Sequence, residues 1–122
     1  MKIIKQTEIV EENVTDTPIF FGGQVNKLSI VDSSISNDYT FAIVKFAKGA
    51  KNKFHAHSSD QILFVTEGHG LVATEANEVS IQEGDSVFIP AGEKHWHGAI
   101  DGHDFTHISL THPDSVTEMF LE

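Results

Sequence analysis

Short β-rich runs separated by turn residues recur along most of this 122-residue chain, and this is its strongest constraint on fold. Regularly spaced runs of this kind are typical of an all-β sandwich or barrel. Gly68 with Gly70 predicts a tight hairpin turn and Ala76 with Asn77 the next turn, so most of the sheet should be antiparallel. The runs cover residues 24–31, 39–47, 61–67, 69–75, 86–90 and 104–111.

The two ends of the chain are less regular. Residues 115–122 carry a weak helical pattern, with Asp114 or Ser115 as its N-cap. The first twenty residues show no pattern that assigns them to an element. We therefore expect one domain over 1–122, with a barrel core at about 39–112 and short extensions at both ends.

Composition and charge exclude several classes of protein. The chain has 39% hydrophobic residues, no cysteine and a net charge of −10, which opposes binding to nucleic acid or to an anionic membrane. No apolar run approaches the roughly 18 residues of a membrane helix, and the first residues do not resemble a secretory signal. A soluble, cytoplasmic protein is expected, and any metal must rest on nitrogen and oxygen ligands.

Histidines are concentrated in one part of the chain, seven of the eight lying between residues 55 and 107. His55 and His57 are two residues apart, so in a strand both side chains point to one side, and Gln61 keeps that parity. In the run from Gln61, the residues Leu63 and Val65 would then face the barrel interior. The opposite face of this run is also apolar, at Ile62 and Phe64, which indicates a cover from the chain ends or from a second subunit.

Two segments together resemble the signatures of the cupin superfamily. In the first, Gly49, His55, His57, Gln61 and Gly68 stand at the family's spacing; the second has Gly84, Pro90, Gly92 and His95. The resemblance implies a double-stranded β-helix, a jelly-roll barrel that holds one divalent transition metal. Its ligands would be His55, His57, Gln61 and His95.

This sequence departs from the majority pattern at two positions. The third ligand position holds Gln61 instead of Glu, and Ala99 replaces the Asn that usually ends the second signature. Four neutral ligands would leave the ion its full charge, which makes it a stronger Lewis acid but weakens its binding. The alternative is a barrel that has lost its metal and keeps only a polar network.

The stretches PAGEKHWHGA at 90–99 and THISL at 106–110 resemble a narrower group of small bacterial cupins. This group includes manganese-dependent hydroxynitrile lyases and the cupins associated with carboxymuconolactone decarboxylases. The resemblance implies manganese as the first choice of metal, with iron, zinc, nickel or cobalt as alternatives, and His107 as the general base. His107 also shares a strand face with Phe105 and Ser109, which agrees with an inward position, although it could equally be a core histidine whose hydrogen bonds are satisfied.

Other residues follow from strand parity. His97 shares the parity of His95, so it is either a second proton carrier or a partner that orients a ligand. Trp96 should point away and pack elsewhere. His69, His103 and His112 are expected at the surface or in turns. The expected lining of the pocket is Ala42, Val44, Phe46, Phe54, Leu63 and Thr111.

Three functions remain open at this stage. The first is a metal-dependent lyase or isomerase acting on a small molecule, with hydroxynitrile cleavage as the concrete case. The second is an iron-dependent dioxygenase, and the third a non-catalytic module that binds or senses a metal or small ligand. A homodimer or larger homo-oligomer is expected in each case.

Overall fold

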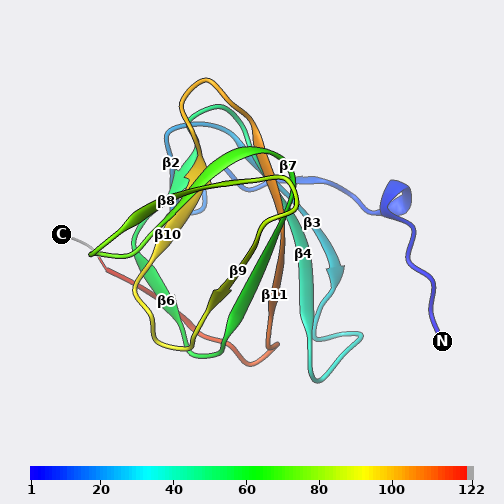
Figure 1. Cartoon of the computed structure of the whole chain (residues 1–122). Coiled ribbons are helices and arrows are strands. Elements are labelled where there is room, and N and C mark those ends of the chain that lie inside the picture. The colour runs from blue at the N-terminus through cyan, green and yellow to red at the C-terminus, as the bar shows by residue number, and fades with distance from the viewer. Residues whose placement is uncertain (121–122) are drawn as a thin grey trace.

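The computed structural model describes residues 1–120, which form strands apart from one short 3-10 helix, η1 (Gln6–Glu8). The strands curl into a half-barrel of two sheets, with the N-terminal segment projecting from its side (Figure 1). The expected all-β class and the barrel are therefore confirmed. The strands are β1 (Glu12–Asn13), β2 (Phe20–Phe21), β3 (Val25–Val31), β4 (Thr40–Phe46), β5 (Lys51–Asn52), β6 (His55–His57), β7 (Gln61–Ala73), β8 (Glu78–Gln82), β9 (Ser86–Ile89), β10 (Trp96–Ala99), β11 (Phe105–Thr111) and β12 (Thr117–Met119).

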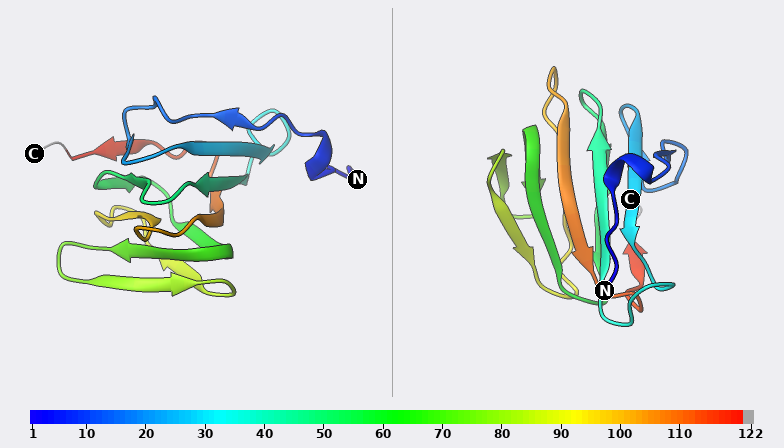
Figure 2. Two further views of the ribbon diagram at one scale, coloured as in Figure 1. Left: turned by 90° about the horizontal axis from the view of Figure 1, so that it is seen from above. Right: turned by 90° about the vertical axis from the view of Figure 1, so that its right-hand side faces the viewer.

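Strand order explains how distant segments meet. The large sheet runs β1-β3-β4-β11-β7-β10-β5-β2, with β8 and β9 also paired to β7, while β12 pairs with β6. All of these pairings are antiparallel. Figure 2 shows β7, β11, β4 and β3 side by side in one wall of the barrel.

The hairpin expected at Gly68 and Gly70 is wrong, because residues 61–73 form one continuous strand, β7. Gly68 has a φ of +80°, and the register between β7 and β11 shifts by one residue beside it, between Thr106 and His107. A positive φ at glycine is used here for a bulge that bends the strand instead of reversing it. A Cβ at Gly68 would lie 1.9 Å from the Asp104 carbonyl oxygen, so no larger residue fits.

The helix expected at 115–122 is also wrong over the described residues, and 121–122 lie outside them. Residues 117–119 form β12, whose Thr117 pairs with His57 and whose Met119 pairs with His55. The ladder to β6 satisfies backbone groups that an isolated turn of helix would leave to water. The chain end therefore closes over the histidine-bearing strand.

The packed core lies on the same inward strand faces as the histidines, since Phe105 shares a face of β11 with His107 and Val65 shares a face of β7 with Gln61. Phe46, Val65 and Phe105 are fully buried in the hydrophobic cluster. The ring of Phe46 also lies 5.5 Å from that of His107 and 5.9 Å from that of His97. The core thus forms one wall of the space in which the histidines meet.

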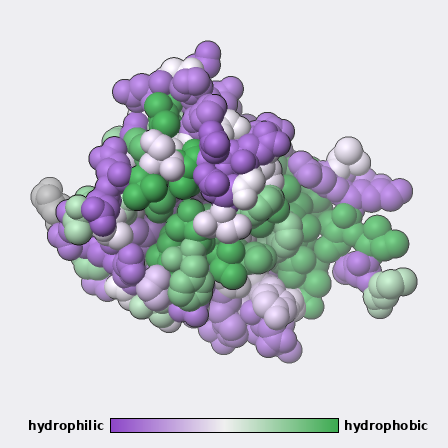
Figure 3. Space-filling model, viewed as in Figure 1, coloured by the Kyte–Doolittle hydropathy of each residue, from purple (hydrophilic) through white to green (hydrophobic). Residues whose placement is uncertain are grey.

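The outer face of the barrel wall carries exposed apolar side chains. Ile62, Phe64 and Phe88 are 42%, 41% and 62% exposed, and Ile62 lies opposite Phe88 between β7 and β9. Hydrophobic residues gather across the centre and right of the face shown in Figure 3. In the described part of the chain, no helix is long and apolar enough to cross a membrane.

Candidate metal centre and its histidine partners

Two histidines face each other because their backbones are paired. His55 in β6 forms an isolated antiparallel bridge with His95, with hydrogen bonds of 2.9 Å in both directions. Their rings consequently lie 4.3 Å apart between centroids, and both residues are 1% exposed. A loop before β10 and a short strand before β7 thus bring together residues forty positions apart in the sequence.

Backbone carbonyls fix how these two rings are oriented. His55 Nδ1 lies 2.7 Å from the Lys53 carbonyl oxygen, and His95 Nδ1 lies 2.8 Å from that of Glu93. Because a carbonyl oxygen only accepts, Nδ1 must carry the hydrogen in each ring. The Nε2 lone pairs therefore point into the barrel, as in histidines that bind metals.

His57 and Gln61 lie beside these two histidines. His57 contacts a residue of β12, and Gln61 contacts a residue of β11. His57 Nδ1 lies 2.9 Å from Thr117 Oγ1, while its Nε2 is buried and has no protein partner. Gln61 Nε2 donates to Ser109 Oγ at 3.0 Å, which leaves Gln61 Oε1 3.3 Å from His95 Nε2. Two lone pairs directed at the same space repel each other unless a cation or proton lies between them, so these residues fit a metal ion.

A second set of contacts joins His97 to His107. His107 Nε2 lies 3.1 Å from His97 Nδ1, and His107 Nδ1 is buried with no protein partner. Asn52 in β5 accepts from the His97 backbone N–H at 2.8 Å, and its Nδ2 lies 3.2 and 3.4 Å from the two ring nitrogens of His97. Because that Nδ2 is nearly equidistant from both nitrogens, it does not select one tautomer of His97.

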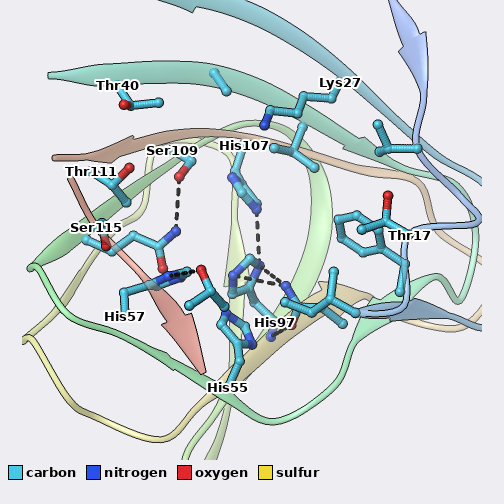
Figure 4. Close-up of a pocket in the computed structure, with 18 of the residues that line it drawn as sticks. Thr17, Lys27, Thr40, His55, His57, His97, His107, Ser109, Thr111 and Ser115 are labelled. Carbon is cyan, nitrogen blue, oxygen red and sulfur yellow. Dashed lines mark hydrogen bonds between the residues drawn. The ribbon is translucent and has the colours of Figure 1, made fainter. Parts of the chain in front are cut away.

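One cavity of about 400 Å³ is lined by His55, His57, Gln61, His97 and His107, whereas His95 lies behind it and contacts Gln61 (Figure 4). His55, His57 and His97 lie on one side of it, with His107 and Ser109 opposite them. The ligand atoms of His55, His95 and His97 all lie within 4.8 Å of one another, and this buried group could hold a metal ion.

Burial keeps these imidazoles neutral. It lowers the pKa of His55 to about 3 and the pKa of His57 to about 4, with repulsion from neighbouring histidines adding to the effect in each ring. Burial likewise lowers the pKa of His107 to about 4 and the pKa values of His95 and His97. No proton has to leave these rings when a cation binds near neutral pH.

Acid should destabilise the metal-free protein. Because the folded-state pKa values lie below 6.5, the unfolded chain takes up protons that the folded chain does not. Stability is therefore complete above about pH 6.5 and is lost as pH falls from there toward 4, by up to about 1.4 kcal/mol per pH unit for each buried histidine. Urea unfolding of EDTA-treated protein at pH 7.5 and 5.0 measures this loss. The stability of the His107→Gln variant should depend less steeply on pH. Equal stability of the wild-type protein at the two pH values would contradict the lowered pKa values of the buried histidines.

Similarity to known proteins agrees with this geometry. Residues 42–120 match the family model of the cupin domain. This chain is a cupin. A cupin-like protein of Thermotoga maritima is 26% identical, with a TM-score of 0.80 over 98% of this chain and 89% of that one.

Two curated proteins match part of this cupin. The (R)-mandelonitrile lyase of Granulicella tundricola is 41% identical over 70 residues, which are 57% of this chain and 53% of the lyase. Acireductone dioxygenase of Prochlorococcus marinus is 35% identical over 46 residues, 34% of this chain and 25% of the dioxygenase. The chain thus spans about half the length of the first relative and a quarter of the second.

The cavity of this cupin includes most of the residues that parity placed in it. Ala42, Val44, Phe46 and Thr111 line it, together with His97 and His107. Leu63 is fully buried but does not line the cavity.

Of two aromatic side chains near the site, Phe54 departs from its expected place and Trp96 follows it. Phe54, expected in the pocket, lies instead on a separate surface hollow with Trp96 and Phe120. The reason is alternation, since Phe54 directly precedes the inward His55. Trp96 points away from the cavity as expected.

Other residues of the site were missed or misplaced by sequence reasoning. Asn52 and Thr117 contact histidines, and Lys27 and His112 line the cavity, although His112 was expected at the surface. His69 and His103 are exposed, as expected. Alternation along β3 is compatible with an inward Lys27, but the sequence alone does not show which face of that strand lines the barrel interior.

Proposed function

We propose that this cupin is a metal-dependent enzyme that cleaves a bond beside the hydroxyl group of a small substrate, with His107 as general base. The carrying observation is that buried His107 lines the same cavity as His55, His57 and Gln61 and contacts His97 at 3.1 Å. The similarity to a mandelonitrile lyase supports the same reaction class. Mandelonitrile is therefore the test substrate.

We propose His55, His57, Gln61 and His95 as the ligands, with manganese as the metal. His97 is the competing ligand, because it belongs to the compact group of three. His57 is preferred since its Nε2 has no partner, whereas His97 already contacts His107 and Asn52. When bound, the metal would act as a Lewis acid that lowers the pKa of a nearby hydroxyl group.

We assign proton transfer to His107 and orientation of the His107 ring to His97. Neutral His107 accepts the substrate hydroxyl proton on its unprotonated ring nitrogen, and His97, whose Nδ1 lies 3.1 Å from His107 Nε2, orients the ring. The electron pair of that O–H bond then forms the carbonyl, the bond between carbon and cyanide breaks, and cyanide leaves with its electron pair. His107 returns the proton to give hydrogen cyanide.

The test uses protein stripped with EDTA and reloaded with manganese or with iron. Benzaldehyde release from mandelonitrile by the manganese form, and none by the stripped form, would support the lyase. Absence of release from every metal form would refute it.

The dioxygenase reading is the second candidate, favoured by the similarity to acireductone dioxygenase. Neutral nitrogen and oxygen ligands also suit iron. Oxygen consumption with an acireductone by the iron form, in an oxygen electrode, would favour this function over the lyase.

We also propose that two copies associate through the outer face of β7 and β9. This face exposes Ile62, Phe64 and Phe88, and the projecting N-terminal segment exposes Ile3 and Val10, each at 79%. Figures 1 and 3 show that segment beside the barrel wall with its own hydrophobic side chains. A twofold pair would bury both apolar surfaces at once.

Light scattering is expected to give twice the mass of one chain. Phe64→Glu with Phe88→Glu should give the mass of one chain, because the charges would be placed in the interface. Val79→Glu is the matched control, since Val79 is 52% exposed on β8. A monomeric wild-type protein would contradict the pairing.

A further inference from the structure

A single cation faces the interior of the barrel. All eight basic residues are lysines, and among residues 1–120 only Lys27 lines the cavity that holds the histidines. Lys45, Lys51 and Lys94 instead form ion pairs with acidic side chains. Within the described part of the chain, no ion pair of Lys27 is found.

Strand register places Lys27 in one row with His107. Lys27 on β3 lies opposite Val44 on β4, and Val44 lies opposite His107 on β11. Directly opposed residues point to the same face, and adjacent strands are about 4.8 Å apart, so the two backbones are roughly 10 Å apart. The long flexible stem of lysine can cover much of that separation, and Figure 4 shows the Lys27 side chain extending over the cavity toward His107 and Ser109.

The nearest acid by register does not neutralise this lysine. Glu12 on β1 lies opposite Lys27, but its side chain is exposed and the two form no ion pair. Lys27 itself is half-buried. The chain has a net charge of −10, yet Lys27 has no acidic partner among the described residues, unlike Lys45, Lys51 and Lys94.

Other residues that line the cavity carry neutral hydroxyl groups. These are Thr40, Thr111 and Ser109, whose Oγ also accepts from Gln61 Nε2. One cation with neutral hydroxyls matches a group with one negative charge and several acceptor oxygens. A phosphate dianion would call for more positive charge or for backbone N–H groups arranged around it.

We infer that Lys27 binds the carboxylate of the substrate, so that the cavity takes a small hydroxy carboxylate with its hydroxyl group toward His107. This inference rests on the proposed function for the role of the hydroxyl, but the binding of the carboxylate does not require turnover. The test substrate mandelonitrile lies outside this class, because it has no charge for Lys27 to pair with. Lys27 becomes a specificity-determining residue.

The experiment compares mandelate with its neutral analogue mandelamide by calorimetric titration of manganese-loaded and EDTA-stripped protein. Lys27→Met should weaken mandelate binding about tenfold or more in both forms while leaving mandelamide within about twofold, since only the charged hydrogen bond is lost. Lys27→Arg should retain mandelate binding. Lys48→Met, at an exposed lysine outside the cavity, is the matched control and should bind like the wild type.

The outcomes separate the inference from the proposed function. Equal mandelate binding by the Lys27→Met variant and the wild type would overturn the inference, even if mandelonitrile is cleaved. Competition by inorganic phosphate as effective as that by mandelate would overturn the assignment to a carboxylate. Selective loss of mandelate binding in Lys27→Met would support the inference even if no metal form turns over mandelonitrile, a result that would refute only the proposed reaction.

Discussion

Replacing His107 with alanine is expected to lower mandelonitrile cleavage about 100-fold or more, the usual scale for loss of a general base. Metal content should not change, because His107 is not among the four proposed ligands. The physical reason is that His107 is buried, lines the cavity beside the proposed ligands and contacts His97 at 3.1 Å. Steady-state rates and elemental analysis of the same preparation measure both quantities.

A His97→Ala variant separates proton transfer from simple packing. His97 contacts His107 at 3.1 Å, so its loss should lower kcat by removing the partner that orients the His107 ring, with a smaller effect on KM. Ser80→Ala, on exposed β8, should match the wild type. Full activity of His107→Ala would refute the base assignment.

The second large effect concerns the metal itself. His55→Ala and His95→Ala should purify with almost no metal, because each removes an Nε2 lone pair whose direction is fixed by a backbone carbonyl. His57→Ala should also lose metal, whereas His97→Ala should keep it. Elemental analysis after dialysis against manganese measures all four.

This comparison also discriminates between the two ligand sets. If His97→Ala loses metal and His57→Ala retains it, the compact group of His55, His95 and His97 is the binding site. Circular dichroism of each stripped variant controls for unfolding, since removal of a buried ring leaves a void.

Strand parity predicted the interior of the barrel better than local turn signals predicted its connections. Two-residue periodicity was enough to place His97 and His107 on the cavity wall, because pairing on both sides keeps the middle of a strand regular. The turn signal failed at Gly68, where the same glycine permits either a hairpin or a bulge and only the partner strand decides between them. The segment at 115–122 failed for a related reason, since weak helical periodicity gives way to an available strand edge at β6.

The contacts that orient the histidines could not be predicted from the sequence. Thr117 and Asn52 are sixty and forty-five positions from the residues they contact, and single-sequence patterns carry no information on such pairs. Lys27 was missed because its significance depends on which face of β3 lines the interior of the barrel. A lysine in a strand is otherwise expected to face water.

The bend at Gly68 has a consequence for how the barrel can open. Because β7 pairs with β9 and β11 before the bend and with β8 and β10 after it, this one strand joins the two halves of the large sheet. Neither half can separate from the other without breaking hydrogen bonds along β7, so the amide hydrogens of this strand should be among the slowest to exchange with deuterium. We therefore expect the two halves of the large sheet to unfold together.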